Sequence, residues 1–191
     1  ALKYAGIARD KAERLEELLG EFYEITRFSS EGLVLDPVPV NISAMLSDIA
    51  KDFVPVLADK GLNWQLHIQE DAQIVCDKDK LERAIDNLIR NAVNYSYDNT
   101  DLVFDLRGEP DKIFISLQNK GAEIPKEKLD RIFDRVSRLA SARSSATRGA
   151  GLGLAIAKEV TELHHGTIGA SSEQDVITFT ICLPRDCKKI V

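Results

Sequence analysis

Apolar positions follow a seven-residue spacing near the N-terminus of the chain. Ala8, Leu15 and Phe22 are seven residues apart, and charged residues lie between them. This spacing is typical of a helix that pairs with a second helix along one apolar seam. We therefore expect one long helix over about residues 1–29, with a partner helix in a second chain or on its N-terminal side.

The pattern breaks over residues 30–40, where Gly32, Pro37 and Pro39 interrupt it. Residues 33–35 form a short, strand-like apolar run. We interpret this segment as a linker or edge strand that leads into a second domain. The expected division is a helical segment over 1–30, a linker over 31–40 and a second domain over 41–187.

From residue 41 onwards, helical and alternating periods follow one another. Asn41 is placed to cap a helix, Gly61 to end it, and Asp77 or Asp79 to cap the next one. The expected helices are 42–59, 79–94, 126–133 and 152–163, and the expected strands are 62–68, 74–75, 102–106, 113–117, 167–170 and 176–183. Because consecutive strands are joined tightly, we expect an α+β fold, with a mixed, mostly antiparallel sheet and helices on one face.

Composition narrows the classes of function. The 191 residues are 44% apolar and 29% charged, which suits a globular protein. The net charge, 25 − 31 = −6, offers no broad basic field, so we expect no nucleic-acid partner. No apolar run approaches the roughly 20 residues of a membrane-spanning helix. The chain begins at Ala1 rather than at a methionine, and we interpret it as an excised soluble piece of a longer protein.

The cysteines and histidines do not indicate a metal centre. Three cysteines without a C-x-x-C pair support neither a disulfide framework nor a zinc site, and they fit a reducing cytoplasm. His67, His164 and His165 do not combine with them at metal-ligand spacing. We interpret the three histidines as surface or packing residues.

One face of the helix expected at 79–94 carries an unusual set of polar residues. Asn87, Asn91 and Tyr95 follow i, i+4, i+8 spacing and share a face that is separate from the apolar one. Neutral carboxamide oxygens suit Mg²⁺, which binds few protein groups and keeps water and phosphate oxygens as its other ligands. The alternative interpretation is a polar helix face exposed to solvent.

A glycine-rich segment leads directly into the helix expected at 152–163. Residues 148–154 read Arg-Gly-Ala-Gly-Leu-Gly-Leu, after a stretch rich in Ser, Ala and Arg that we expect to be a mobile loop. Glycines let backbone N–H groups approach a phosphate, and a helix N-terminus favours negative charge. The segment is not a P-loop, because no Gly-Lys-Ser/Thr follows, and it is not a dinucleotide fingerprint in a parallel βαβ unit.

The order of four motifs resembles the ATP-binding domain of sensor histidine kinases. The motifs are Asn87–Asn91, Asn119–Pro125, Ile132–Arg138 and Gly149–Leu154, which match the N, G1, F and G2 boxes of that family. The resemblance covers about residues 40–184 and implies the two-layer α/β sandwich of the histidine kinase, gyrase and chaperone ATPases. The opening helix resembles the second helix of the family's dimerisation and phosphoacceptor hairpin. Residues 24–27 and 142–145 are most similar to VanS-type sensors of vancomycin resistance.

The resemblance implies ATP and Mg²⁺ as ligands and gives a role to each matched position. Asn91 would hold the Mg²⁺, with Asn87 close by as a second candidate ligand, and Asn87 and Arg138 would be the catalytic residues. Residues 138–150 would form a lid over the nucleotide. The other implied ATP-binding residues are Asn94, Tyr95, Asn119, Gly121, Ile124, Gly149, Ala150, Gly151, Leu152, Gly153, Leu154 and, beneath the adenine, Thr178.

The chain also departs from the family's pattern at several of these positions. Asn119 stands where the family usually has an Asp that binds the adenine amino group. Its carbonyl can still accept that hydrogen bond, but without charge assistance. Glu123 stands where a second glycine is usual, and Asn94 where a Lys is common.

The function implied by the resemblance is transfer of the ATP γ-phosphate to a histidine and from there to an Asp of a response regulator. No His-Glu-(hydrophobic)-basic-Thr-Pro segment occurs in the sequence, so the acceptor histidine would belong to an absent helix and the chain alone would be inactive or weak. The implied assembly is a homodimer through the N-terminal helix, within the cytoplasmic portion of a cell-membrane sensor. Contact with the membrane would be made only through segments absent here.

Two other functions remain open on the residues. A gyrase- or chaperone-type ATPase needs a general base, and those relatives have a Glu where this chain has Asn87, whose amide cannot take a proton at neutral pH. The third hypothesis is a non-catalytic dimerisation or docking module with a degenerate pocket. The residues at 119 and 123 favour it, while the intact asparagines and glycines argue against it.

Overall fold

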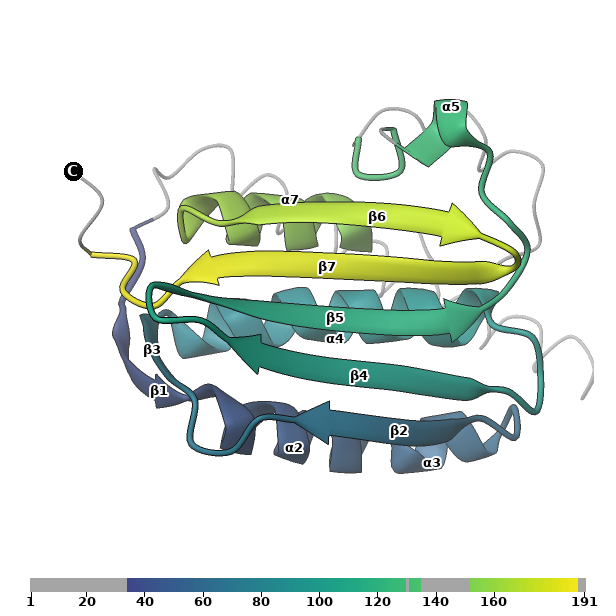
Figure 1. Cartoon of the computed structure of the whole chain (residues 1–191), viewed down its shortest axis with the longest axis horizontal. Helices are drawn as coiled ribbons and strands as arrows, with labels where there is room; N and C mark the ends of the chain where they lie inside the picture. Colours follow the sequence, from purple (N-terminus) through teal and green to yellow (C-terminus); the bar gives the residue numbers. More distant parts are fainter. Residues whose placement is uncertain (1–33, 130, 135–151, 189–191) are drawn as a thin grey trace, which may run out of the picture.

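A five-stranded mixed sheet forms the centre of the protein (Figure 1). The computed structural model describes residues 34–129, 131–134 and 152–188. The strands are β2 (Asn63–Ile68), β4 (Asp101–Gly108), β5 (Lys112–Lys120), β7 (Val176–Pro184) and β6 (Thr167–Glu173), in that order across the sheet. β2 runs parallel to β4, and all other neighbouring strands are antiparallel. The expected mixed, mostly antiparallel sheet is confirmed.

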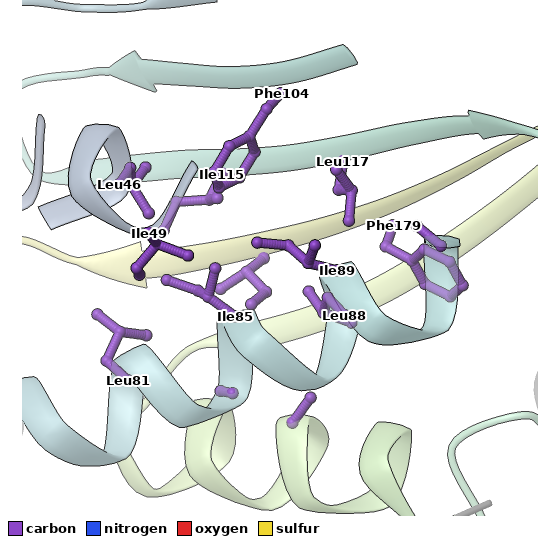
Figure 2. Packing of buried hydrophobic residues seen from close by; sticks show 14 of the residues in the cluster. Leu46, Ile49, Leu81, Ile85, Leu88, Ile89, Phe104, Ile115, Leu117 and Phe179 are labelled. Atoms are coloured by element: carbon purple, nitrogen blue, oxygen red, sulfur yellow. The ribbon is translucent and has the colours of Figure 1, made fainter. Parts of the chain in front are cut away.

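The helices lie on one face of this sheet (Figure 1). They are α2 (Ile42–Asp52), α3 (Val54–Ala58), α4 (Lys78–Tyr95) and α7 (Gly153–Leu163), while the short α5 (Lys126–Leu129) lies beside the edge strand β6. Figure 2 shows Leu81, Ile85 and Ile89 of α4 pointing toward Ile115 and Leu117 of β5. Alternate strand residues face the helices, so this layer contact forms the core.

A second, two-stranded sheet begins the described part of the chain. β1 (Val38–Asn41) pairs antiparallel with β3 (Gln73–Cys76), with Val38 opposite Cys76. The strand therefore starts within the segment interpreted as a linker, and the run at 34–35 is not itself a strand. Pro39 is tolerated because β1 has only one neighbouring strand. Its partner strand lies more than 30 residues further on, which local patterns do not reveal.

The helix expected at 42–59 is two helices. α2 ends at Asp52, and α3 begins at Val54. The N–H of Phe53, between them, donates to the Ile49 carbonyl at 3.2 Å. Pro55 has no N–H to continue the α2 hydrogen-bond pattern, and it fits the first turn of a new helix instead. The short helix expected at 126–133 likewise ends at Leu129.

The predicted helix boundaries are otherwise confirmed by their end groups. The Asn41 side chain accepts a hydrogen bond from the Ala44 N–H at 3.0 Å, and Asp77 accepts from the Lys80 N–H at 3.1 Å. Gly61 closes the segment after α3 with φ +65°, a conformation that side chains disfavour. All three cysteines are free thiols, as expected. The expected N-terminal helix lies outside the described residues.

None of the helices within residues 34–129, 131–134 and 152–188 is long and apolar enough to cross a membrane.

Candidate functional site

Helix α4 holds the two predicted asparagines in a fixed position. Asn87 and Asn91 are half-buried and lie one turn apart, beside the apolar face that contacts the sheet. The C-terminal end of the helix is held by Lys60, whose Nζ donates to the carbonyls of Val93 at 2.8 Å and Asn94 at 3.1 Å. A cation at this end also favours the helix dipole. The sequence analysis did not identify this role of Lys60.

The N-terminus of α7 lies directly against Asn87. A Cβ atom at Gly153 would come within 2.9 Å of the Asn87 Oδ1, so any other residue here would have to displace the Asn87 side chain. The first turn of α7 has no side-chain cap; Leu152 occupies the N-cap position, and it and Leu154 are buried. Uncapped N–H groups at a helix N-terminus favour an anion. The structure therefore brings the predicted asparagine face and the predicted phosphate-binding helix together.

Asn119 is the least satisfied polar side chain of the described chain. It follows Ile113, Ile115 and Leu117 in the row of β5 residues that face the helices, and it is 2% exposed. Neither its Oδ1 nor its Nδ2 has a hydrogen-bond partner among the described residues. A buried polar atom without a partner costs about 1–3 kcal/mol, so such atoms in native proteins call for a specific explanation.

The segment after β5 connects Asn119 to the end of α4. The Gly121 N–H donates to the Asp175 carbonyl at 2.9 Å, and the Tyr97 N–H donates to the Lys120 carbonyl at 2.8 Å. A Cβ atom at Gly121 would collide with the Tyr95 carbonyl oxygen and would lie 3.3 Å from the Asn119 Nδ2. The glycine is therefore required by the close approach of two backbone segments.

Ile124, the last residue of the predicted set in this segment, is held by the β6 edge strand. Its N–H donates to the Ser172 Oγ at 2.9 Å, and Ser172 is itself 2% exposed. Ser172 was not predicted, because the strand expected there ended at residue 170. The following motif contributes Ile132 and Phe133 to the core, and the Phe133 ring meets Phe179 edge-on at 6.3 Å between centroids.

Thr178 does not join this group of residues. The buried residues of β7 alternate, and they include Ile177 and Phe179, so the half-exposed Thr178 lies on the sheet face away from the helices. The residue opposite Asn119 in the register is Ile177. The expected position of Thr178 beneath a base is therefore wrong, because its assignment ignored the two-residue period of the strand.

The remaining predicted residues fall into two groups. Asn94 and Tyr95 are exposed at the end of α4, with 43% of the Tyr95 surface accessible. The others lie outside the described residues, and they are Arg138, Gly149, Ala150, Gly151 and the expected lid over 138–150.

A cavity of about 610 Å³ lies elsewhere, between β1, α2 and the first half of α4. Its lining includes four carboxylates, on Asp48, Asp52, Glu82 and Asp86, against two cations. Burial raises the pKa of Asp86, and the nearby Arg90 opposes that rise. Because an excess of carboxylates repels the negatively charged phosphates, this cavity does not suit a nucleoside triphosphate. Among the described residues, no cluster of three His, Cys, Asp or Glu side chains could hold a metal ion.

Comparisons with known proteins place this geometry among ATPases. Residues 76–186 match the family model described as histidine kinase-, DNA gyrase B-, and HSP90-like ATPase. The sensor protein VanSC of Enterococcus gallinarum is 44% identical over 183 residues, which are 96% of this chain and 50% of that protein. The sensor protein VanS of Enterococcus faecium is 43% identical over 184 residues, 95% of this chain and 47% of that protein. The chain thus spans about half the length of these relatives.

A solved structure supports the same fold. Histidine kinase ThkA, in complex with response regulator protein TrrA, superposes with a TM-score of 0.78 over 98% of this chain and 52% of that chain. The sequences are 20% identical, so the likeness concerns the fold alone. The expected sandwich of the histidine kinase, gyrase and chaperone ATPases is confirmed.

Proposed function

As the chain belongs to the histidine kinase-, DNA gyrase B-, and HSP90-like ATPase family, and its similar relatives are sensor proteins, we propose that it is the ATP-binding catalytic part of a sensor histidine kinase. The observation that carries the proposal is the buried amide of Asn119, which has no described partner and lies beside Gly121. A nucleotide base presents hydrogen-bonding groups along one edge, and these would satisfy the amide.

The opposite end of the site is suited to phosphate and its counter-ion. The uncapped N-terminus of α7 offers backbone N–H groups to a phosphate, beside the Asn87 side chain. Asn91 and Asn87 supply neutral oxygens, the ligand type that Mg²⁺ accepts alongside phosphate and water oxygens. When bound, such an ion neutralises charge on the phosphate oxygens. We propose Asn91 as its ligand and Asn87 as the second candidate.

The described residues fit positioning of ATP better than hydrolysis. Among the described residues, the side chain nearest to a Cβ atom at Gly153 is the amide of Asn87, which cannot accept a proton at neutral pH and so cannot act as the base that activates water. Phosphoryl transfer relies on orientation and charge neutralisation. We propose that the γ-phosphate passes to a histidine on an acceptor helix and then to a response-regulator Asp, with Arg138 as the cation that assists.

The assembly that we propose follows the same relatives. The N-terminal helix pairs with a second copy, and the chain forms the cytoplasmic portion of a membrane-bound sensor. The gyrase-type ATPase is not favoured because of the amide at Asn87. The degenerate docking module is not favoured either, because the asparagines and glycines of the site are intact.

Calorimetric titration tests the proposal. ADP and a non-hydrolysable ATP analogue are titrated into the chain with and without Mg²⁺, and we expect binding that Mg²⁺ strengthens. Asn91→Ala should remove most of the Mg²⁺ dependence, because it deletes the proposed ligand oxygen. Asn63→Ala on β2 is the matched control, since Asn63 is exposed and lies on an edge strand of the sheet. No binding by the unaltered chain at millimolar nucleotide would support the docking module instead.

A further inference from the structure

We propose that the base-binding end of this site accepts a purine with either a donor or an acceptor at position 6. Hypoxanthine nucleotides then bind about as well as adenine nucleotides. Asn119 is the residue that determines this specificity. The inference rests on the proposed function, because it concerns the nucleotide bound at that site. It names a wider substrate class, the 6-amino and 6-oxo purine nucleotides.

The first argument is that nothing in the described protein fixes the orientation of the Asn119 amide. Two other amides are each oriented by a backbone N–H. The Asn41 Oδ1 accepts from Ala44 at 3.0 Å, and the Gln69 Oε1 accepts from Gly108 at 2.6 Å. Asn119 has no such bond on either atom, although it is 2% exposed. Its oxygen and nitrogen can exchange places by rotation about the last side-chain bond without breaking a protein hydrogen bond.

The second argument is that neighbouring polar groups are already committed. The Gly121 N–H donates to the Asp175 carbonyl, and the Ser96 Oγ donates to the Ala92 carbonyl at 2.6 Å. The residues beside Asn119 on the same sheet face are Leu117 along β5 and Ile177 across on β7, and both are apolar. The amide of Asn119 is therefore the group that can distinguish the edge of a base here.

The third argument is the chemistry of the two groups. Adenine presents an amino donor at position 6 and an acceptor at N1, whereas hypoxanthine presents an acceptor oxygen at position 6 and an N–H donor at N1. A carboxamide carries one acceptor and one donor group side by side, so it matches either edge after rotation. A carboxylate carries acceptors alone, and it would repel a 6-oxo group. An Asp at position 119 would select adenine, and Asn119 does not.

The test compares dissociation constants for ADP and IDP measured by calorimetry at one Mg²⁺ concentration. For the unaltered chain we expect the two constants to agree within about fivefold, which corresponds to about one neutral hydrogen bond. Asn119→Asp should raise the ratio of the IDP dissociation constant to the ADP dissociation constant at least about tenfold, because a site without a donor leaves the 6-oxo group unpaired. GDP is a third probe, because it adds a 2-amino group to the same edge as IDP.

The matched control is Gln118→Glu, the same amide-to-acid change one residue earlier on the opposite face of β5. It should leave the ratio unchanged. Binding of ADP with IDP weaker by more than about fivefold in the unaltered chain would overturn the inference and leave the proposed function standing. Failure to bind ADP would overturn the proposed function itself. The comparison of ADP and IDP on the unaltered chain needs no substitution. It therefore tests the inference even if Asn119→Asp fails to fold.

Discussion

Helices α4 and α7 meet at two places that differ in how their polar groups are satisfied. At the N-terminal end of α4, the Asp77 N–H donates to the His164 Nε2 at 3.0 Å, and the other ring nitrogen of His164 donates to the Val160 carbonyl at 2.8 Å. Further along α4, Gly153 approaches Asn87 at an uncapped helix end, and Asn119 on β5 has no hydrogen-bond partner among the described residues. One place is complete without a ligand, while the other has free donors and acceptors.

The difference separates stability from binding. A buried histidine with both nitrogens bonded stabilises the contact between the two helices and needs no further partner. Free groups at the other place cost stability in the ligand-free protein and are recovered when a ligand bonds to them. Substitutions at the two places should therefore have opposite signatures, and three experiments test this.

The largest expected effect is on folding, at the satisfied end. His164→Ala should lower the free energy of unfolding by about 2–4 kcal/mol, because it leaves a cavity and an unpaired Asp77 N–H. Urea denaturation measures it. The affinity of the folded fraction for ADP should be nearly unchanged. His165→Asn is the matched control; His165 is exposed with φ +58°, a conformation that Asn tolerates, so the change should be within about 0.5 kcal/mol.

The next largest effect is a gain in the stability of the ligand-free protein, opposite in sign to the first. Asn119→Leu replaces an unpaired buried amide with an apolar side chain of similar size, so the ligand-free protein should gain about 1 kcal/mol of stability. ADP affinity should fall about tenfold or more, since the base loses its hydrogen bonds. Thermal unfolding without nucleotide measures the change in stability, and calorimetry measures the change in ADP affinity. A loss of stability would show that the amide is satisfied in the ligand-free protein, and the comparison would fail.

The smallest effect concerns pH. Burial lowers the pKa of His164 below its ordinary value of 6.5, partly offset by its hydrogen bond to the Val160 carbonyl and by the nearby Asp77 carboxylate, while Lys80 lowers it further. Below about pH 6.5 the unfolded chain binds more protons than the folded one, so the free energy of unfolding should decrease as the pH falls. The contribution is fully present above that pH.

Urea denaturation between pH 7.5 and 5.5 follows this decrease. His164→Gln keeps an acceptor for the Asp77 N–H but does not titrate, so its slope in this window should be smaller. Equal slopes for the two proteins would assign the pH dependence to other groups.

Local signals made much of the fold predictable. Asn41, Asp77 and Gly61 act on residues within a few positions, so their roles as helix ends follow from sequence alone. The break near Phe53 was not predicted, because the apolar period continues through it to Leu57 and Pro55 was not considered. The β1–β3 pairing joins segments far apart in the chain, and local periodicity carries no information about it.

The site was predictable in its residue types and less so in its details. The order of motifs placed Asn87, Asn119 and Gly153 in one site, and the structure brings Asn87 and Gly153 into contact. The order of motifs did not reveal that Asn119 is buried without a partner among the described residues. Its burial depends on which part of the sheet the helices cover. Thr178 was placed on the wrong face, although its alternation with buried neighbours carried the signal.

Asp77 also connects the entrance of the domain to helix α4. Its carboxylate accepts from the Asp36 N–H at 3.0 Å, six residues before the first residue of α2, and from the Lys80 N–H at the start of α4. The incoming chain is thus clipped to the helix that carries Asn87 and Asn91. A displacement of residue 36 therefore either breaks its hydrogen bond to Asp77 or moves the Asp77 side chain that caps α4. In this way a mechanical force applied to the incoming segment is transmitted to the helix that carries the site residues.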